Sequence, residues 1–543
     1  MRDIKTVFAI LGFFAGILSF HLYYKVNYVS LSKPTPERSV AMESSDQQPV
    51  IDDIRNKIML INSKADLLKV RQEIIELAKA NPNFLGVQIF KMFVEPLPLF
   101  EGILWRLRGI VEDTDLTHLA ILYRLRQIYE NRYIYGPHVE VLFHYLTDPP
   151  KDPAKTMFKK ISEVQNFLAK EVLPGMEMML FVARDMMAAK PELFQFEFDK
   201  SIWVGEDKDR RFLDPDDAKK TFIRPYMSYI ISGLARMVGT IYYLDCYNLD
   251  DTPAAMNEVL KFSAINNMTN RFLTLGKGRG LPQVITRKEI YEQLRKFPTL
   301  LKARYDESTA NQKLQKSFDH FALAAQSDLE GYVCSIKYPE MIIQGEEIPA
   351  DYNCKDLERD MLERDVSQEF VRIGFQEEEH FVVKGKYFLL DPNQLLLNHK
   401  VKFNELSERA RLYRESKNGE AVILASDVTG KKISINVRAA FKYQESLQKY
   451  FPTTFDDIDM MSARGGFDIR GVGQWVTPEG PGTKRREWAW NYTYGRPRTW
   501  RPDAVTFGGF LPDATNANIY ELMYTMKLTN ALRPFSLLFT TIY

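Results

Sequence analysis

PYMSYIISGLARMVGTIYYLDC, residues 225–246, is the most apolar stretch in the interior of the chain. Arg236 lies in its middle, and several Ser and Gly residues dilute its apolar character. A membrane-spanning helix here would bury the Arg236 side chain near the bilayer centre, at a cost of about 2.5–3.5 kcal/mol. We therefore expect this stretch to form a helix in the core of a folded domain rather than a second membrane span.

Helical patterns extend outward from this stretch over residues 51–345. Ser63 is a suitable N-cap with Asp66 at the third helical position, and Asn81 begins an Asn-Pro-Asn sequence that ends the same helix. Pro137 suits a helix start. Further helices are predicted at about residues 119–129, 155–171, 174–190, 216–246, 252–266, 287–304 and 308–330. Because short polar joints separate them, we predict a mainly α fold of stacked helical hairpins or an irregular helical bundle.

The character of the sequence changes at about residue 346. Residues 346–379 carry twelve acidic and four basic side chains. Two β-hairpins are then predicted at about residues 380–390 and 421–437, where runs of β-forming residues flank turns. We therefore expect residues 346–543 to form a smaller, loop-rich α+β domain.

The N-terminal residues determine where we expect the protein to lie. Residues 7–24 are apolar, and a helix of that length covers about 27 Å, close to the hydrocarbon thickness of a bilayer. A cleaved signal peptide and a buried helix are the alternatives, although no small-x-small cleavage site follows the run. We expect an uncleaved transmembrane signal anchor, followed by a flexible linker rich in Ser and Pro over residues 25–50. The bulk of this single-pass membrane protein would lie on the exported side, which is the periplasm in a bacterium with an envelope.

The composition of the chain excludes several classes of protein. Its 543 residues carry 72 Lys and Arg and 71 Asp and Glu, so the net charge is +1. With 45% apolar residues the chain has ample surface to bury, which excludes disorder as its main state. The neutral balance gives no whole-chain argument for nucleic-acid binding. The odd count of three cysteines excludes complete intramolecular pairing, and Cys334 and Cys354 either pair in an oxidising compartment or remain thiols.

Residues 464–509 are rich in tryptophan and arginine. They contain four of the six tryptophans, and their eight basic side chains outnumber four acidic ones. Arginine among flat rings suits a protein interface, a glycan or an anionic phosphate. The plainer alternative is a small aromatic core with solvated arginines. We select as candidate partner- or glycan-binding residues Trp475, Arg485, Arg486, Trp488, Trp490, Arg496, Arg498 and Trp500.

Other groupings of polar residues carry less weight. The carboxylates of residues 456–459 could hold a divalent cation, but nothing around them resembles a nucleotide-binding pattern. His138 and His144 are too far around a helix to share one face, and His118, which lies over Leu122 and Leu125, is expected to be a core or boundary histidine. No nucleophile-elbow, zinc-protease or phosphate-loop signature occurs. We therefore predict no catalytic residue, no metal and no cofactor.

The anchor, the linker, the helical array and the missing catalytic signatures together favour a scaffold. We expect a membrane-anchored structural protein of an envelope-associated assembly, which binds other envelope proteins or a second copy of itself and does not bind nucleic acid. The alternative is a cell-envelope glycan-binding protein, or a glycan-acting enzyme, that uses residues 464–509.

Overall fold

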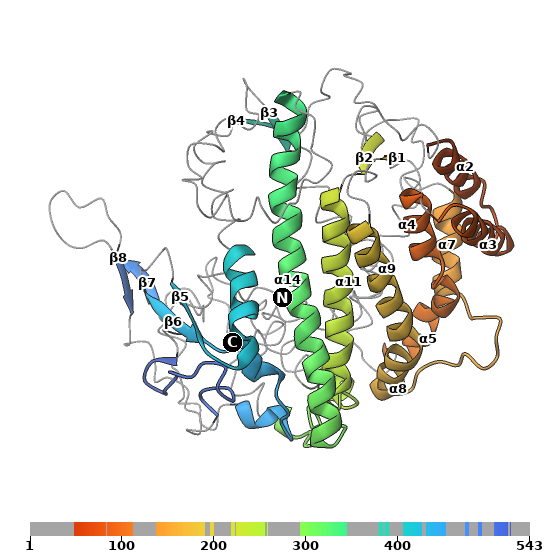
Figure 1. Cartoon of the computed structure of the whole chain (residues 1–543). Helices are drawn as coiled ribbons and strands as arrows, with labels where there is room; N and C mark the ends of the chain where they lie inside the picture. Colours follow the sequence, from red (N-terminus) through yellow and green to blue (C-terminus); the bar gives the residue numbers. More distant parts are fainter. Residues whose placement is uncertain are drawn as a thin grey trace, which may run out of the picture.

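The computed structural model of the chain is mainly helical, with small two-stranded sheets (Figure 1). It describes residues 48–82, 84–111, 137–189, 196–199, 219–222, 224–255, 258, 294–344, 380–383, 386–389, 406–425, 431–451, 473–476, 487–490, 504–519 and 522. The expected anchor at residues 7–24 lies outside these residues. Within the described part of the chain, no helix combines the length and apolar character that a membrane span requires.

Two long helices form the centre of the fold. α11 (Arg224–Asp245) contains the apolar stretch described above, and α14 (Glu307–Gln344) packs along it in the antiparallel direction. The helices approach closely at Gly239, where an added Cβ would lie 3.1 Å from the Ser317 carbonyl oxygen. The Ser317 hydroxyl donates a hydrogen bond of 2.7 Å to the Gly239 carbonyl at the same place. The small residues of α11 therefore allow this close packing.

A first core lies on the α9 side of these helices (Figure 1). It contains apolar side chains such as Ile54, Ile74, Leu107 and Val238, and α11 closes it. The shorter helices that build it are α2 (Gln48–Met59), α3 (Lys64–Ala80), α4 (Leu85–Val94), α5 (Ile103–Val111), α7 (Pro137–Thr147), α8 (Ile161–Phe167) and α9 (Leu173–Ala189), with the 3-10 turn η1 (Leu97–Phe100).

Several predicted helix ends are confirmed in this region. The Ser63 hydroxyl caps α3 by accepting a hydrogen bond of 3.1 Å from the Asp66 amide, and the helix ends before Asn81. α7 begins at Pro137. α2 begins at Gln48, so the last residues of the expected linker are helical.

The predicted break near residue 172 is wrong, because α8 and α9 form one continuous helical run. A π-helical turn, η3 (Leu168–Val172), joins them directly before Pro174. Proline lacks an N–H donor and its ring crowds the preceding turn, and a widened turn accommodates both effects without ending the helix.

A second core lies on the other side of the α11–α14 pair. It combines Tyr243 and Tyr247 at the end of α11 and Leu314 and Phe318 of α14 with later residues such as Leu424. Those later residues belong to helical residues 406–415, the 3-10 turns η7 (Val437–Phe441) and η8 (Leu447–Tyr450), a hairpin, and residues 504–519 and 522. A further 3-10 turn, η6 (Ser416–Asn418), follows the helical residues 406–415. This core therefore takes side chains from both sides of residue 346.

Neighbouring residues of the central helices contribute to opposite cores. Tyr242 belongs to the first core and Tyr243 to the second, and Ala324 and Ala325 of α14 divide in the same way. The α11–α14 pair is thus a shared wall between the two cores.

Four antiparallel strand pairs complete the described structure. β3 (His380–Val383) pairs with β4 (Lys386–Leu389), and β5 (Val422–Ala425) pairs with β6 (Lys432–Ile435), which confirms both predicted hairpins. Two further pairs were not expected from the sequence. They are β1 (Phe196–Asp199) with β2 (Lys219–Phe222), and β7 (Gly473–Val476) with β8 (Glu487–Trp490).

Four predicted helices differ from the structure at their ends. The helix expected from residue 155 begins only at Ile161, and the helix expected to end at about residue 330 continues to Gln344. The helix expected from residue 216 begins only at Arg224, because β2 occupies the preceding residues. The helix expected over residues 287–304 ends at residue 295 in the structure, so the prediction is wrong for residues 296–304. Pro298 lies in this part of the chain, which forms turns. Ala303 instead forms a β-bridge with Tyr247, and Lys302 forms one with Ser446. The helix expected at residues 119–129 lies outside the described residues.

Candidate functional site

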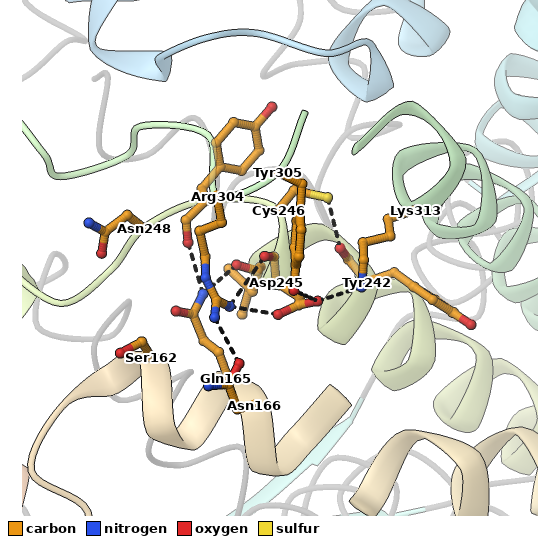
Figure 2. A network of polar contacts seen from close by, with 12 residues as sticks. Ser162, Gln165, Asn166, Tyr242, Asp245, Cys246, Asn248, Arg304, Tyr305 and Lys313 are labelled. Carbon is orange, nitrogen blue, oxygen red and sulfur yellow. Dashed lines mark hydrogen bonds and ion pairs between the residues drawn. The ribbon is translucent and has the colours of Figure 1, made fainter. Parts of the chain in front are cut away.

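The most concentrated polar chemistry among the described residues surrounds Asp245, the last residue of α11 (Figure 2). Its side chain is only 1% exposed. A carboxylate at a helix C-terminus faces the negative end of the helix dipole, and a buried charge is costly without partners. The surrounding residues must therefore supply positive charge and hydrogen-bond donors.

Three side chains supply these donors. Arg304 Nη1 lies 2.6 Å from Asp245 Oδ1, and Lys313 Nζ lies 2.7 Å from Oδ2. The Tyr305 hydroxyl also donates to Oδ2, at 2.9 Å. Arg304 and Tyr305 come from the turn before α14 and Lys313 from α14 itself, so the carboxylate ties α11 to both.

Arg304 also connects this group to α8. Its Nη2 donates to Asn166 Oδ1 at 2.8 Å, and its backbone amide donates to the Cys246 carbonyl at 2.9 Å. The planar guanidinium has donors that point in several directions, so one side chain can bind Asp245 and Asn166 together. The Arg304 side chain is 15% exposed and lies at the edge of the group.

The charge states of the donors follow from their surroundings. Burial alone would lower the pKa of Lys313, but its hydrogen bond to Asp245 and the charge of that carboxylate outweigh burial and raise it. Burial and the Asp245 charge raise the pKa of Tyr305. Lys313 therefore stays charged and Tyr305 stays a hydrogen-bond donor at neutral pH.

Residues of α8 also hold the turn that follows α11. Gln165 Nε2 donates to the carbonyl oxygens of Leu244 and Tyr247, at 2.6 and 2.9 Å. The Asp250 carboxylate accepts hydrogen bonds from the Ser162 amide at 2.6 Å and from its hydroxyl at 2.9 Å. These contacts satisfy carbonyls at the end of one helix and an amide at the start of another.

Cys246, the one cysteine in this group (Figure 2), is poorly suited to react. It is 1% exposed, and burial, followed by the charge of Asp245, raises the pKa of its thiol to about 12. A reactive cysteine needs an accessible thiolate, which a raised pKa disfavours. The described residues also contain no group of three or more His, Cys, Asp or Glu side chains that could hold a metal. The ion pairs and hydrogen bonds around Asp245 form a clamp that joins α8, α11 and α14.

A second ion cluster lies further along the same helices. Asp328 of α14 contacts the Arg236 guanidinium of α11, and Arg409 Nη1 lies 3.7 Å from the same carboxylate. Burial, followed by the charge of Arg409, lowers the pKa of Arg236 to about 10, so Arg236 remains charged at neutral pH. Arg236, whose charge made a membrane span unfavourable, therefore has an acidic partner within the fold.

The structure describes only part of the Trp/Arg-rich segment. Trp475 of β7 is the register partner of Trp488 of β8, and Trp490 pairs with Gly473. The remaining candidates lie outside the described residues, namely Arg485, Arg486, Arg496, Arg498 and Trp500. The role of these eight residues in binding a partner or a glycan stays a prediction.

The histidines of α7 lie in different surroundings, as their spacing predicts. His138 is buried with 4% exposure. His144 is about half exposed, with its ring 3.3 Å from an Asp148 oxygen and 4.0 Å from one of Glu140. Residues 456–459, His118 and Cys354 lie outside the described residues.

The clamp around Asp245 was not predicted from the sequence. Asp245 follows an apolar stretch, which marks it as a charge at a helix end but says nothing about its partners. Arg304 and Lys313 lie 59 and 68 residues away along the chain, so no local spacing reveals the group. Comparison of the chain with protein-family models, with curated proteins and with solved structures found no match.

Proposed function

We propose that the chain is a structural or scaffold protein of an envelope-associated multiprotein assembly. In this proposal residues 7–24 form a transmembrane anchor, and the remainder lies on the exported side as stacked helical hairpins or an irregular bundle. It binds other envelope proteins, or a second copy of the chain, through its helical surface.

One observation carries the proposal, and it concerns the outer face of α9. Met178 and Phe181 are 61% and 67% exposed and lie one helical turn apart. Met176 and Leu180 of the same helix are buried in the first core, so α9 has apolar side chains on both faces. Full burial of such a side chain contributes roughly 1.5–3 kcal/mol, which a partner could recover by covering the outer face. Methionine and aromatic residues are also enriched at protein interfaces.

The polar clusters support the proposal from another direction. Asp245 and Asp328 join α8, α11, α14 and residues 406–415 through ion pairs and hydrogen bonds. Such a cross-linked body presents a surface whose shape is fixed before binding, which lowers the entropic cost of association.

The test uses full-length chain extracted from its native membrane with a mild detergent. Wild type is expected in a large complex, measured by native gel electrophoresis and mass photometry. The double variant Met178→Ser/Phe181→Ser should lose that complex without a change in thermal stability. Ile423→Ser is the matched control, because Ile423 is 58% exposed on β5, away from α9. Recovery of wild type as a lone monomer would overturn the proposal.

A second candidate function is glycan binding by residues 464–509. It is favoured by the strand register that pairs Trp475 with Trp488, because paired aromatic residues can stack on sugar rings. If this reading is correct, Trp488→Ala and Trp490→Ala should abolish retention on peptidoglycan, and Gln474→Ala on β7 should not. Lost complex assembly with unchanged sugar retention would favour the scaffold instead.

A further inference from the structure

A cleft lies between the first turns of α14 and the chain that follows η7. It is shallow and largely open to solvent, with a volume of about 840 Å³. This size falls within the range of about 300–1,000 Å³ that is usual for small-molecule sites. Eight of the ten lining residues are polar or charged, although the surface that they present is largely apolar, so a ligand that carries both polar and apolar groups is favoured.

The charges around the cleft are unbalanced. Lys316 of α14, Arg438 of η7 and Lys442 line it, and Glu307 is the only carboxylate among the lining residues. The lining therefore carries three positive charges and one negative charge. This excess of positive charge favours a ligand with at least one negative group.

Arg438 adds a specific donor to this positive charge. Its guanidinium carbon lies 4.8 Å from the centre of the Phe318 ring, which fixes the plane of the group against the second core. Burial lowers the pKa of Arg438, although the nearby charge of Asp319 acts in the opposite direction. Among the described residues, the buried Nη1 of Arg438 has no hydrogen-bond acceptor. An unsatisfied buried donor is costly, so an anion that reached Nη1 after a small movement of the surrounding side chains would supply its acceptor.

The walls of the cleft are held in place by bonds to neighbouring elements. The Tyr443 amide donates to Asn311 Oδ1 at 3.0 Å, which joins the chain after η7 to α14. Lys316 Nζ donates to the Tyr242 hydroxyl at 3.1 Å, which itself donates to Glu177 at 2.6 Å. The ammonium group is therefore positioned before any ligand binds.

We propose that this cleft binds a small organic oxyanion whose carboxylate or phosphate group contacts Arg438 and Lys442. The side-chain amides of Gln312, Gln315 and Gln444, which also line the cleft, suit hydroxyl groups on the same ligand. This binding site goes beyond the proposed scaffold function and does not depend on it. A ligand here would contact α14 and η7 together.

The experiment is calorimetric titration of the full chain with inorganic phosphate, with citrate and, as an uncharged probe, with glycerol, at matched ionic strength. Saturable binding with a Kd of the order of 1 mM or tighter is expected for at least one anion and not for glycerol. Comparison of phosphate with citrate separates a phosphate ligand from a carboxylate ligand.

The variants give effects of opposite sign. Arg438→Gln and Lys442→Gln should each weaken anion binding, by about tenfold for Arg438. Glu307→Gln should tighten it, because it removes the only negative charge of the lining. Lys432→Gln is the control, since Lys432 is exposed on β6 and does not line the cleft.

Two outcomes would overturn the proposal. One is the absence of saturable binding of either anion to the wild-type chain. The other is equal binding by wild type, Lys442→Gln and Lys432→Gln, which would mean that the anions act by general screening. Lys442 is exposed, so Lys442→Gln remains decisive even if Arg438→Gln, which also loses its contact with Phe318, lowers the stability of the fold.

Discussion

At the scale of single residues, Asp245 is the charge whose surroundings are most completely determined. Its carboxylate has two cationic partners and a hydroxyl donor within 2.9 Å, and it is almost fully buried. A buried ion pair adds little net stability compared with an apolar alternative, because desolvation offsets the attraction. Removing one member is nevertheless costly, since the remaining charges stay in place without compensation.

We therefore predict that Asp245→Asn lowers the free energy of unfolding by about 3 kcal/mol. The amide cannot neutralise Arg304 and Lys313, which would then face each other as like charges. Urea unfolding followed by circular dichroism measures the change. Asp185→Asn is the matched control, because Asp185 is exposed on α9 and should change stability by less than about 0.5 kcal/mol. Equal stability of both variants would show that the clamp is energetically neutral.

Residue-scale prediction from the sequence succeeds where cause and effect are local. Ser63 and Asp66 are three positions apart, so the cap that they form can be read directly from the chain. Asp245 and its partners meet only because α14 returns along α11. Nothing in the sequence near Asp245 specifies that return.

At the scale of elements, the packing of α11 against α14 depends on a glycine. Glycine usually weakens a helix, by about 1 kcal/mol relative to alanine. At Gly239 that cost is offset by the close packing that glycine allows. An added Cβ at this position would lie 3.1 Å from both the Ser317 carbonyl oxygen and the Phe321 ring of α14. Gly175 of α9 is different, because an added Cβ there would meet nothing within 4 Å.

The two glycines should respond to alanine with opposite signs. Gly175→Ala is expected to stabilise the protein by about 0.5–1 kcal/mol, through helix propensity alone. Gly239→Ala is expected to destabilise it by about 1 kcal/mol or more, since the backbone of α14 must move to make room. Thermal unfolding of the two variants beside wild type measures both. A stabilised Gly239→Ala protein would contradict the close approach of α11 and α14.

Predictions of helices and strands fail where a partner distant in the sequence, or an unusual turn, determines the local structure. Residues 297–304 have helix-forming side chains after Pro298, yet Lys302 and Ala303 pair with Ser446 and Tyr247 instead. Near Pro174 the chain adopts a π turn rather than ending its helix. The hairpins β3–β4 and β5–β6 were predictable, because their turn residues and β-forming runs are adjacent in the sequence.

At the scale of the whole molecule, the α11–α14 pair couples two cores. Because Tyr242 and Tyr243 are consecutive but belong to different cores, neither core can loosen without disturbing the same helix. The charge pattern of the sequence changes at about residue 346 and suggested two separate domains. It therefore did not reveal that the two cores share α11 and α14.

We predict that the two cores unfold together. Ile74→Ala in the first core and Leu424→Ala in the second should each lower the free energy of unfolding by about 2–5 kcal/mol, since both side chains are fully buried. Each variant should raise hydrogen exchange in peptides from both cores. Ile423→Ala, next to Leu424 but exposed, is the control and should change exchange little. Faster exchange confined to the core that carries the substitution would contradict this coupling.

The wide sequence separation of the Asp245 clamp also has a consequence for kinetics. Asp245 is 59 residues from Arg304, and Arg304 is 138 residues from Asn166, so the clamp closes only after three distant segments have docked. Contacts that require several long-range dockings tend to form after the transition state for folding, and their loss then acts mainly on the unfolding rate. The clamp would consequently set the lifetime of the folded chain more than the speed at which it folds, a property that would suit the scaffold role proposed above.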